Sequence, residues 1–271
     1  MPEELTSSKK TMIEIEEFWR RSALDYGISH KASWADINCM NLEFENLVNY
    51  IKDGDKVLDV GCANGYTTLR IAAKRNISIK GIDYIEEMVA NAKQRLLNVE
   101  KTLESEVTFE IGDALNIDDS DSKYDVVSFI RVLCNLHNNE NIIKALKEAC
   151  RVLKVGGLLL ISEPTVHGLS KLNLLRTEWG LDEIDLPSQN RYLDEEVLKK
   201  SVYGRLQHID TKNFASSYFV LTRVLKPLLS KASGKENNIV DPDLEWNKLS
   251  TLMPSFGDYS SQNFSCLRRP R

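Results

Sequence analysis

The chain has 271 residues, 42% of them hydrophobic, so it is long enough to bury the core of one large domain with insertions. Its formal net charge of -5 at pH 7 argues against a nucleic-acid partner, because such binding relies on clustered lysine and arginine side chains. Five cysteines without C-x-x-C spacing and four histidines without ligand spacing predict neither a disulfide framework nor a metal site.

The first ten residues are polar, and we expect them to be frayed. Glu3 and Glu4 make this end acidic, where a signal peptide would be basic, and no apolar run approaches the ~20 residues that span a bilayer. We therefore expect a cytoplasmic protein without stable membrane insertion, acting on a small molecule.

Two helices are predicted before the first strand, at residues 13–26 and 42–51, from the helical spacing of their apolar side chains. The first has an aromatic face. Packed over a ligand cleft, it would bring Tyr26, Ser33 and Trp34 to the ligands. The alternative is that these aromatic side chains only cover the edge of the sheet.

Residues 57–69 predict a strand, a tight loop and the start of a helix. Gly61 and Gly65 let the backbone turn sharply and approach a ligand, while the free N–H groups of the helix start point into the same space. The spacing matches neither the G-x-G-x-x-G fingerprint of dinucleotide-binding folds nor a phosphate-binding G-x-x-x-x-G-K-[ST] loop.

A second strand at residues 77–82 ends at Asp83, 22 positions after Gly61. A carboxylate there can accept hydrogen bonds from both hydroxyls of a ribose, at the offset of about 20 residues expected across one βαβ unit. The alternative is a solvated Asp at a strand end. A helix at residues 85–97 follows, which puts Tyr84 or Ile85 beside a bound adenine.

Three further strands complete the predicted parallel sheet, and a helix connects the last two of them. They are the strand at 107–111 before Asp113, the strand at 125–130 before Arg131 and Asn135, the helix at 139–153, and the strand at 158–162 before Glu163. The remaining elements are helices at 172–179, 194–200, 217–229 and 244–252, strands at 206–214 and 259–267, and a linker at 230–238.

Asp59, Gly61 and Gly65 resemble the D-x-G-x-G-x-G motif of class I S-adenosylmethionine (SAM) dependent methyltransferases, with Ala63 in place of the middle glycine. Residues 151–157 resemble the R-x-L-K-P-G-G turn of the same family, with Val155 in place of proline. The resemblance covers about residues 55–165.

This resemblance implies an α/β fold with a doubly wound, Rossmann-like, mostly parallel sheet of seven strands in the order 3-2-1-4-5-7-6. The last strand is expected to be antiparallel, with helices on both faces and a helical insertion between strands six and seven. Residues 1–50 would form an N-terminal helical cap, 51–165 the SAM-binding core and 166–271 the substrate-side half of a single domain.

The resemblance also implies the ligands and the residues that bind them. SAM and its product S-adenosylhomocysteine are the expected cofactor pair, with no metal, and Asp113 is carried over as the acceptor of the adenine amino group. The expected cofactor-binding residues are Asp59, Gly61, Cys62, Ala63, Gly65, Asp83, Tyr84, Asp113, Ala114, Ile130 and Arg131.

Residues just past strands four and five should face the reacting methyl group, because ligands bind outside the carboxyl ends of parallel strands. Glu163 is the candidate base or hydroxyl acceptor, Arg131 is suited to a substrate phosphate or carboxylate, and Asn135 lies beside them. The alternative is that Arg131 and Glu163 pair with each other. The expected substrate-binding residues are Tyr26, Trp34, Asn173, Arg176, Asn190, Tyr192 and Tyr218.

The segment 172–195 is similar to methyltransferases of bacterial surface-polysaccharide gene clusters. This similarity implies methyl transfer to an oxygen, or a nitrogen, of a sugar, nucleotide-linked or phosphorylated building block. A lipid, quinone-type or secondary-metabolite acceptor is the alternative, and so is a catalytically silent interaction protein, although Asp59, Asp83 and Asp113 are all present. The glycine spacing argues against an NAD-dependent oxidoreductase.

The insertion at residues 216–253 is long for a connection in a compact domain. Its apolar stripe includes Tyr218 and Leu221, while Arg223 and Lys226 fall toward the other face. We expect this helix to cover the cleft as a lid together with the N-terminal helix. A membrane-surface helix and a contact in a homodimer are the alternatives.

Overall fold

A seven-stranded sheet with the order β3-β2-β1-β4-β5-β7-β6 forms the centre of the molecule, which we describe from a computed structural model for residues 10–202, 204–234, 238 and 240–271. β1 to β5 pair in parallel, and β7 runs antiparallel to both β5 and β6. The predicted order and the antiparallel last strand are confirmed. The strands are β1 (Lys56–Val60), β2 (Ser78–Asp83), β3 (Glu106–Ile111), β4 (Tyr124–Ile130), β5 (Leu153–Pro164), β6 (Gln207–Lys212) and β7 (Gln262–Arg268).

Helices surround this sheet, and several begin earlier than their apolar spacing predicted. The α-helices are α1 (Met12–Tyr26), α2 (Ile37–Leu47), α3 (Tyr66–Lys74), α4 (Glu86–Val99), α5 (Asn139–Val152), α6 (Val166–Glu178), α7 (Glu195–Val202), α8 (Ser216–Val220), α9 (Lys226–Ser233) and α10 (Glu245–Leu252). Short helical turns are η2 (His30–Ala32), η3 (Val48–Tyr50), η4 (Glu100–Thr102), η5 (Leu133–Asn135) and the π-helix η6 (Leu221–Leu225).

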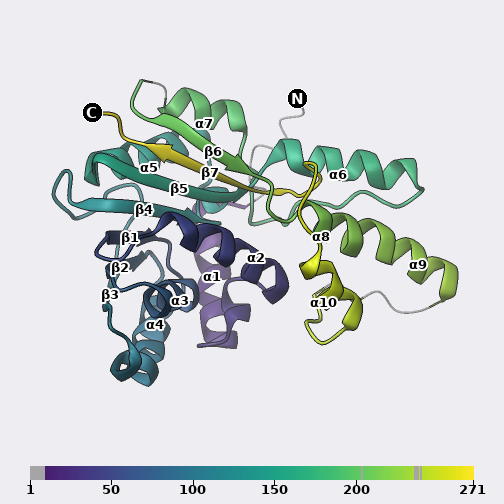
Figure 1. The fold of residues 1–271 in the computed structure, drawn as a ribbon, viewed down its shortest axis with the longest axis horizontal. Coiled ribbons are helices and arrows are strands. Elements are labelled where there is room, and N and C mark those ends of the chain that lie inside the picture. Colours follow the sequence, from purple (N-terminus) through teal and green to yellow (C-terminus); the bar gives the residue numbers. More distant parts are fainter. Residues whose placement is uncertain (1–9, 203, 235–237, 239) are drawn as a thin grey trace.

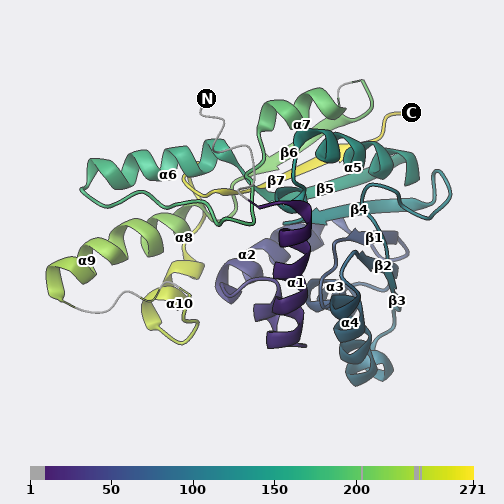
Figure 2. The ribbon, with the colours of Figure 1, turned by 180° about the vertical axis from the view of Figure 1, so that it is seen from behind.

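The sheet has a separate apolar core on each face, because successive side chains of a strand point to opposite sides. On one face, Leu58 and Phe129 pack with Leu146 of α5. On the other face, Val57 packs with Ile71 of α3 and with side chains of α2 and η3. Figure 1 and the reverse view in Figure 2 show α5 and α7 on the first side and α2 and α3 on the second.

The carboxyl ends of β1 and β4 carry loops that lie against each other. A Cβ atom built on Gly61 would lie 2.3 Å from a methyl carbon of Val132, closer than real side chains approach. Gly61 also has a φ of +71°, in the left-handed region that glycine adopts most readily. Gly61 is therefore required for two reasons: a side chain there would clash with Val132, and the backbone is left-handed.

The helix predicted at 217–229, within the insertion between β6 and β7, is present but is not α-helical throughout. It runs without a break through α8, the π-helix η6 and α9, and Arg223 and Lys226 do not lie on its exposed face. Arg223 and Lys226 are 8% and 9% exposed, whereas Leu225 is 42% exposed. A π-helix adds one residue to a turn, so the register of the stripe shifts and the expected face changes.

A buried polar contact ties this insertion to the start of α2. Asp36 is the N-cap of α2 and accepts the Cys39 amide, and it also accepts hydrogen bonds from the Tyr218 hydroxyl at 2.8 Å and from Arg223 at 2.7 Å. All of these groups are nine-tenths or more buried. The contact joins the N-terminal cap to the insertion between β6 and β7.

Beyond this contact, α6, α9 and α10 extend past the edge of the sheet in both views (Figures 1 and 2). Among the described residues, no helix has both the length and the apolar character that crossing a bilayer requires. Residues 1–9, which we expected to be frayed, lie outside the described part of the chain.

Replacing Tyr218 with Phe should lower the free energy of unfolding by about 1 kcal/mol, because a buried hydroxyl–carboxylate hydrogen bond is lost. The Asp36 carboxylate keeps its other donors. Urea denaturation would measure the change, with Tyr26→Phe, at a tyrosine that is 49% exposed, as the matched control. Equal effects of the two substitutions would contradict this role of Tyr218.

Candidate functional site

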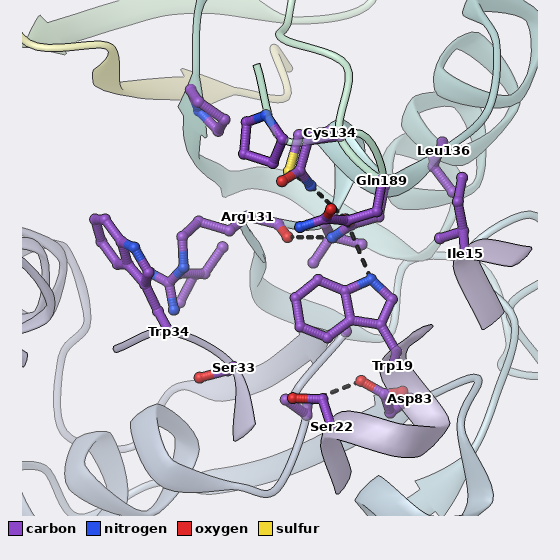
Figure 3. A pocket seen from close by; sticks show the side chains of 18 of the residues that line it. Ile15, Trp19, Ser22, Ser33, Trp34, Asp83, Arg131, Cys134, Leu136 and Gln189 are labelled. Atoms are coloured by element: carbon purple, nitrogen blue, oxygen red, sulfur yellow. Dashed lines mark hydrogen bonds between the residues drawn. The ribbon is translucent and has the colours of Figure 1, made fainter. Parts of the chain in front are cut away.

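A cavity of about 620 Å³ lies at the carboxyl ends of β1, β2, β4 and β5. The loops after these strands line it together with α1, residues 31–35 and the segments 184–192 and 219–223. The residues just before β7 also line it, because an antiparallel strand begins at the edge where its parallel neighbours end. Figure 3 shows Trp19 and Asp83 on one side of the cavity and Arg131 beside Trp34 on another.

The β1 loop has a left-handed backbone at alternate residues, Gly61, Ala63 and Gly65. Ala63, at the position of the usual middle glycine, has a φ of +48°. The Asp83 carboxylate fixes this loop by accepting the amide of Ala63 at 2.8 Å and the amide of Ile85 at 2.9 Å. Burial raises the pKa of Asp83 to about 6, against the opposing effect of these two donors.

Asp59 at the end of β1 is buried and accepts hydrogen bonds from the hydroxyls of Thr68 at 2.6 Å and Ser128 at 2.8 Å. Burial raises the pKa of Asp59 despite these two donors. Asp113 after β3 accepts the amide of Leu115 at 2.8 Å. Both carboxylates line the cavity.

Arg131 follows β4 with a φ of +57°, which is uncommon for a residue other than glycine. Its guanidinium forms an ion pair with the buried carboxylate of Glu43 and lies over the Trp34 ring, 4.8 Å from the centroid. The other oxygen of Glu43 accepts the Ser162 hydroxyl at 2.6 Å. The expected alternative, an ion pair between Arg131 and Glu163, is wrong.

Glu163 does not reach the cavity as the expected base would have to. Its side chain is fully buried, and its carboxylate accepts the backbone amides of Val132, Leu133 and Cys134 at 2.7, 2.8 and 3.1 Å. Burial raises the pKa of Glu163 to about 7, although these donors oppose the shift. Both oxygens are therefore committed to the loop after β4.

Asn135 joins three segments around the cavity. Its side-chain oxygen accepts Trp19 Nε1 of α1 at 3.3 Å and Asn190 Nδ2 at 2.7 Å, while its own Nδ2 donates to the Arg131 carbonyl at 2.8 Å. The N-terminal helix and the segment that contains Asn190 are thus linked through one amide group. In Figure 3 a dashed line marks the bond from the Trp19 indole.

Most residues expected at the site line the cavity. They are Asp59, Gly61, Cys62, Ala63, Asp83, Tyr84, Asp113, Ala114, Ile130, Arg131, Asn135, Tyr26, Trp34, Asn190 and Tyr192.

Five expected site residues lie outside the cavity lining, and their contacts explain why. Gly65 packs under the loop near Phe109, and Glu163 is enclosed as described above. The side-chain amide of Asn173 donates to the Ile184 carbonyl and accepts the Ile184 amide. Arg176 donates to the backbone carbonyls of Asp182 and Arg223. Tyr218 points to Asp36, while its neighbour Phe219 lines the cavity.

Several lining residues were not predicted as site residues. They include Trp19, Met88, Leu169, Leu172, Ile184, Gln189, Phe219, Arg223, Ser261 and Gln262. The expected antiparallel last strand was a usable signal for Ser261 and Gln262, because its first residues must lie at the ligand edge. Among the described residues, no group of three or more His, Cys, Asp or Glu side chains has the geometry of a metal site.

Comparisons with known proteins agree with this geometry. A protein-family model described as "Methyltransferase domain" matches residues 51–257. The chain is 30% identical over 195 residues to a demethylmenaquinone methyltransferase of Leptospira interrogans, which covers 63% of this chain and 75% of that enzyme.

A 27-O-demethylrifamycin SV methyltransferase of Amycolatopsis mediterranei is 30% identical over 113 residues, which is 42% of this chain and only 40% of that enzyme. The N-methyltransferase NodS of Bradyrhizobium japonicum, solved with S-adenosylhomocysteine, shares the fold with a TM-score of 0.55 at 14% identity, over 93% of this chain and 99% of NodS. Since the family model matches more than half of its length, the chain belongs to the methyltransferase-domain family.

Proposed function

We propose that this enzyme transfers the methyl group of SAM to an oxygen or nitrogen of a small, largely apolar, ring-containing acceptor. The observation that carries the proposal is the charge balance of the cavity: Arg131 and Arg223, its two lining arginines, are each paired with a buried carboxylate. A wall whose guanidinium charges are compensated and that carries many apolar side chains favours a neutral, apolar ligand over an anion.

In this proposal the loops after β1, β2 and β3 bind the cofactor. Asp83 would accept hydrogen bonds from the ribose, Asp113 would lie at the adenine, and the backbone of residues 61–63 would pass close to the remainder of SAM. The left-handed turns of this loop and the size of the cavity fit such a ligand. When bound, SAM supplies an activated methyl group for an in-line displacement.

The acceptor half is bounded by aromatic and aliphatic side chains from four segments. Trp34 comes from the N-terminal cap, Leu172 from α6, Ile184 from the following loop and Phe219 from α8. Such rings and branched chains bury apolar ligand area effectively. The names of two relatives, a demethylmenaquinone and a demethylrifamycin methyltransferase, support an acceptor of this kind.

The sugar, nucleotide-linked or phosphorylated acceptor expected from the sequence is the second candidate. The polar side chains of Asn135, Asn190 and Gln262 along the same cavity favour it. A phosphate, however, would find the Arg131 and Arg223 guanidinium groups already paired. For this reason we place the apolar acceptor first.

The protein's contribution to catalysis in this proposal is alignment and exclusion of water. Asn135 connects α1 to the segment with Asn190 and so closes the cavity around the reacting groups. Glu163 would act as a positioning residue, because it holds the loop that presents Arg131 and Asn135. The acceptor nucleophile would therefore be activated without contact to Glu163.

Purified enzyme incubated with SAM should methylate naphthols or hydroxyquinones but not sugar nucleotides or sugar phosphates. Mass spectrometry of the products would identify the acceptor class, with heat-inactivated enzyme as the control. Methylation of the sugar compounds alone would overturn the first candidate in favour of the second.

Replacing Asp83 with Ala should weaken S-adenosylhomocysteine binding by about 1 to 3 kcal/mol, because buried ribose hydroxyls would lose a charged acceptor. Isothermal titration calorimetry measures this loss directly. Asp118→Ala is a matched control, since Asp118 is exposed and lies outside the cavity lining. Unchanged affinity in the Asp83 variant would remove Asp83 from the cofactor site.

Replacing Glu163 with Gln should alter stability in a pH-dependent way. The folded chain keeps the Glu163 proton up to about pH 7, whereas the ordinary pKa is 4.5, so its stabilising contribution is full below pH 4.5 and lost as the pH rises through 7. The stability of the wild type relative to the variant should therefore fall between pH 5 and pH 8, on the order of 3 kcal/mol. Urea denaturation at both pH values measures it, and a pH-independent difference would contradict the assignment.

A further inference from the structure

Helix α2 carries two buried carboxylates on one face, and each holds an arginine that lines the cavity. Asp36 at its N-cap pairs with Arg223, and Glu43, two turns later, pairs with Arg131. Asp36 and Glu43 are 0% and 2% exposed. The two arginines come from distant parts of the chain, the end of β4 and η6, so α2 sets the charge of two cavity walls.

Several contacts hold the Glu43–Arg131 pair and the backbone that carries it. One Glu43 oxygen binds the guanidinium and the other accepts the Ser162 hydroxyl. The Arg131 amide donates to the Ser162 carbonyl at 2.8 Å, its carbonyl accepts Asn135 Nδ2, and its guanidinium covers Trp34. Neither charged group can turn away without breaking these contacts.

An unpaired guanidinium in such a place would attract anions, because charges interact strongly where water is largely excluded. With Glu43 in contact, an anionic acceptor meets a carboxylate as well as a cation and gains little. It would also lose its hydration shell on entry. A neutral acceptor avoids both costs.

We propose that Glu43 is a specificity-determining residue, whose carboxylate neutralises Arg131 and makes the acceptor site select uncharged over anionic ring compounds. This inference rests on the proposed apolar acceptor and deepens it. Glu43 precedes the stretch, residues 51–257, that matches the methyltransferase-domain model. The selectivity is therefore built by the N-terminal cap of this chain, outside the matched region.

The test compares two probes of the same shape, the anion 1-naphthoate and the neutral 1-naphthamide, bound to enzyme saturated with S-adenosylhomocysteine. Calorimetry gives the ratio of their affinities. In the wild type naphthamide should bind at least as tightly as naphthoate. In E43Q the ratio should shift toward naphthoate by about tenfold or more, because Gln keeps the side-chain shape and frees one positive charge.

Three further variants test whether the change in the ratio comes from the charge on Arg131. E45Q removes the same charge from an exposed position of α2 and should leave the ratio unchanged. The double variant E43Q/R131Q removes both charges and should restore the wild-type ratio. R131Q alone should shift the ratio away from naphthoate, so the proposal can be tested even where E43Q does not fold.

An unchanged ratio in E43Q and R131Q, with naphthamide bound by the wild type, would overturn this inference and leave the apolar acceptor site intact. A gain for naphthoate that persists in E43Q/R131Q would also overturn it, since Arg131 would not be its source. Failure of the wild type to bind either probe would overturn the apolar acceptor site and the inference with it.

Discussion

The cavity depends on the chain leaving the ends of β1 and β4 in opposite directions. These strands are neighbours, but α3 after β1 packs on one face of the sheet and α5 after β4 packs on the other. Ligands bind in α/β sheets where such a divergence occurs. Backbone amides of both loops then lack a strand partner and need side-chain acceptors. Asp83 supplies them for the β1 loop and Glu163 for the β4 loop.

Four of the carboxylates around the cavity therefore have two different tasks. Asp83 and Glu163 accept backbone amides and fix loops, whereas Asp36 and Glu43 pair with arginines and fix charge. Burying a charge is costly unless it is compensated locally, and each of these groups has its compensation in direct contact. The site is organised before a ligand enters, which reduces the reorganisation needed for methyl transfer.

The sequence predicted which residues after β1 and β2 line the cavity, because that information is local. A strand, a small-residue loop and a carboxylate one βαβ unit later are enough to bring Asp59, Gly61 and Asp83 together. The walls that contain Arg131 and Arg223 depend on contacts that no local pattern contains. Glu43 and Arg131 are 88 positions apart, and Asp36 and Arg223 are 187 positions apart.

Glu163 is a second case in which the local sequence did not predict what a side chain contacts. It was expected just past the fifth strand, where a base would belong, and it lies within the carboxyl end of β5. Its role is decided by the turn η5, which folds three amides over the carboxylate. A helical stripe was likewise predicted for the insertion, but one π-turn moved Arg223 from the expected outer face to the cavity wall.

Backbone strain lies at two points of the cavity wall, at residues that are not glycine. Ala63 and Arg131 both have left-handed φ values, which cost roughly 1 to 2 kcal/mol for a residue with a Cβ. Ala63 is held there by Asp83, and Arg131 by the Ser162 carbonyl and Asn135. A glycine would relieve the strain at position 131 but would remove the guanidinium that meets Glu43. The strained backbone is thus the means by which the end of β4 directs a cation toward α2 and Trp34.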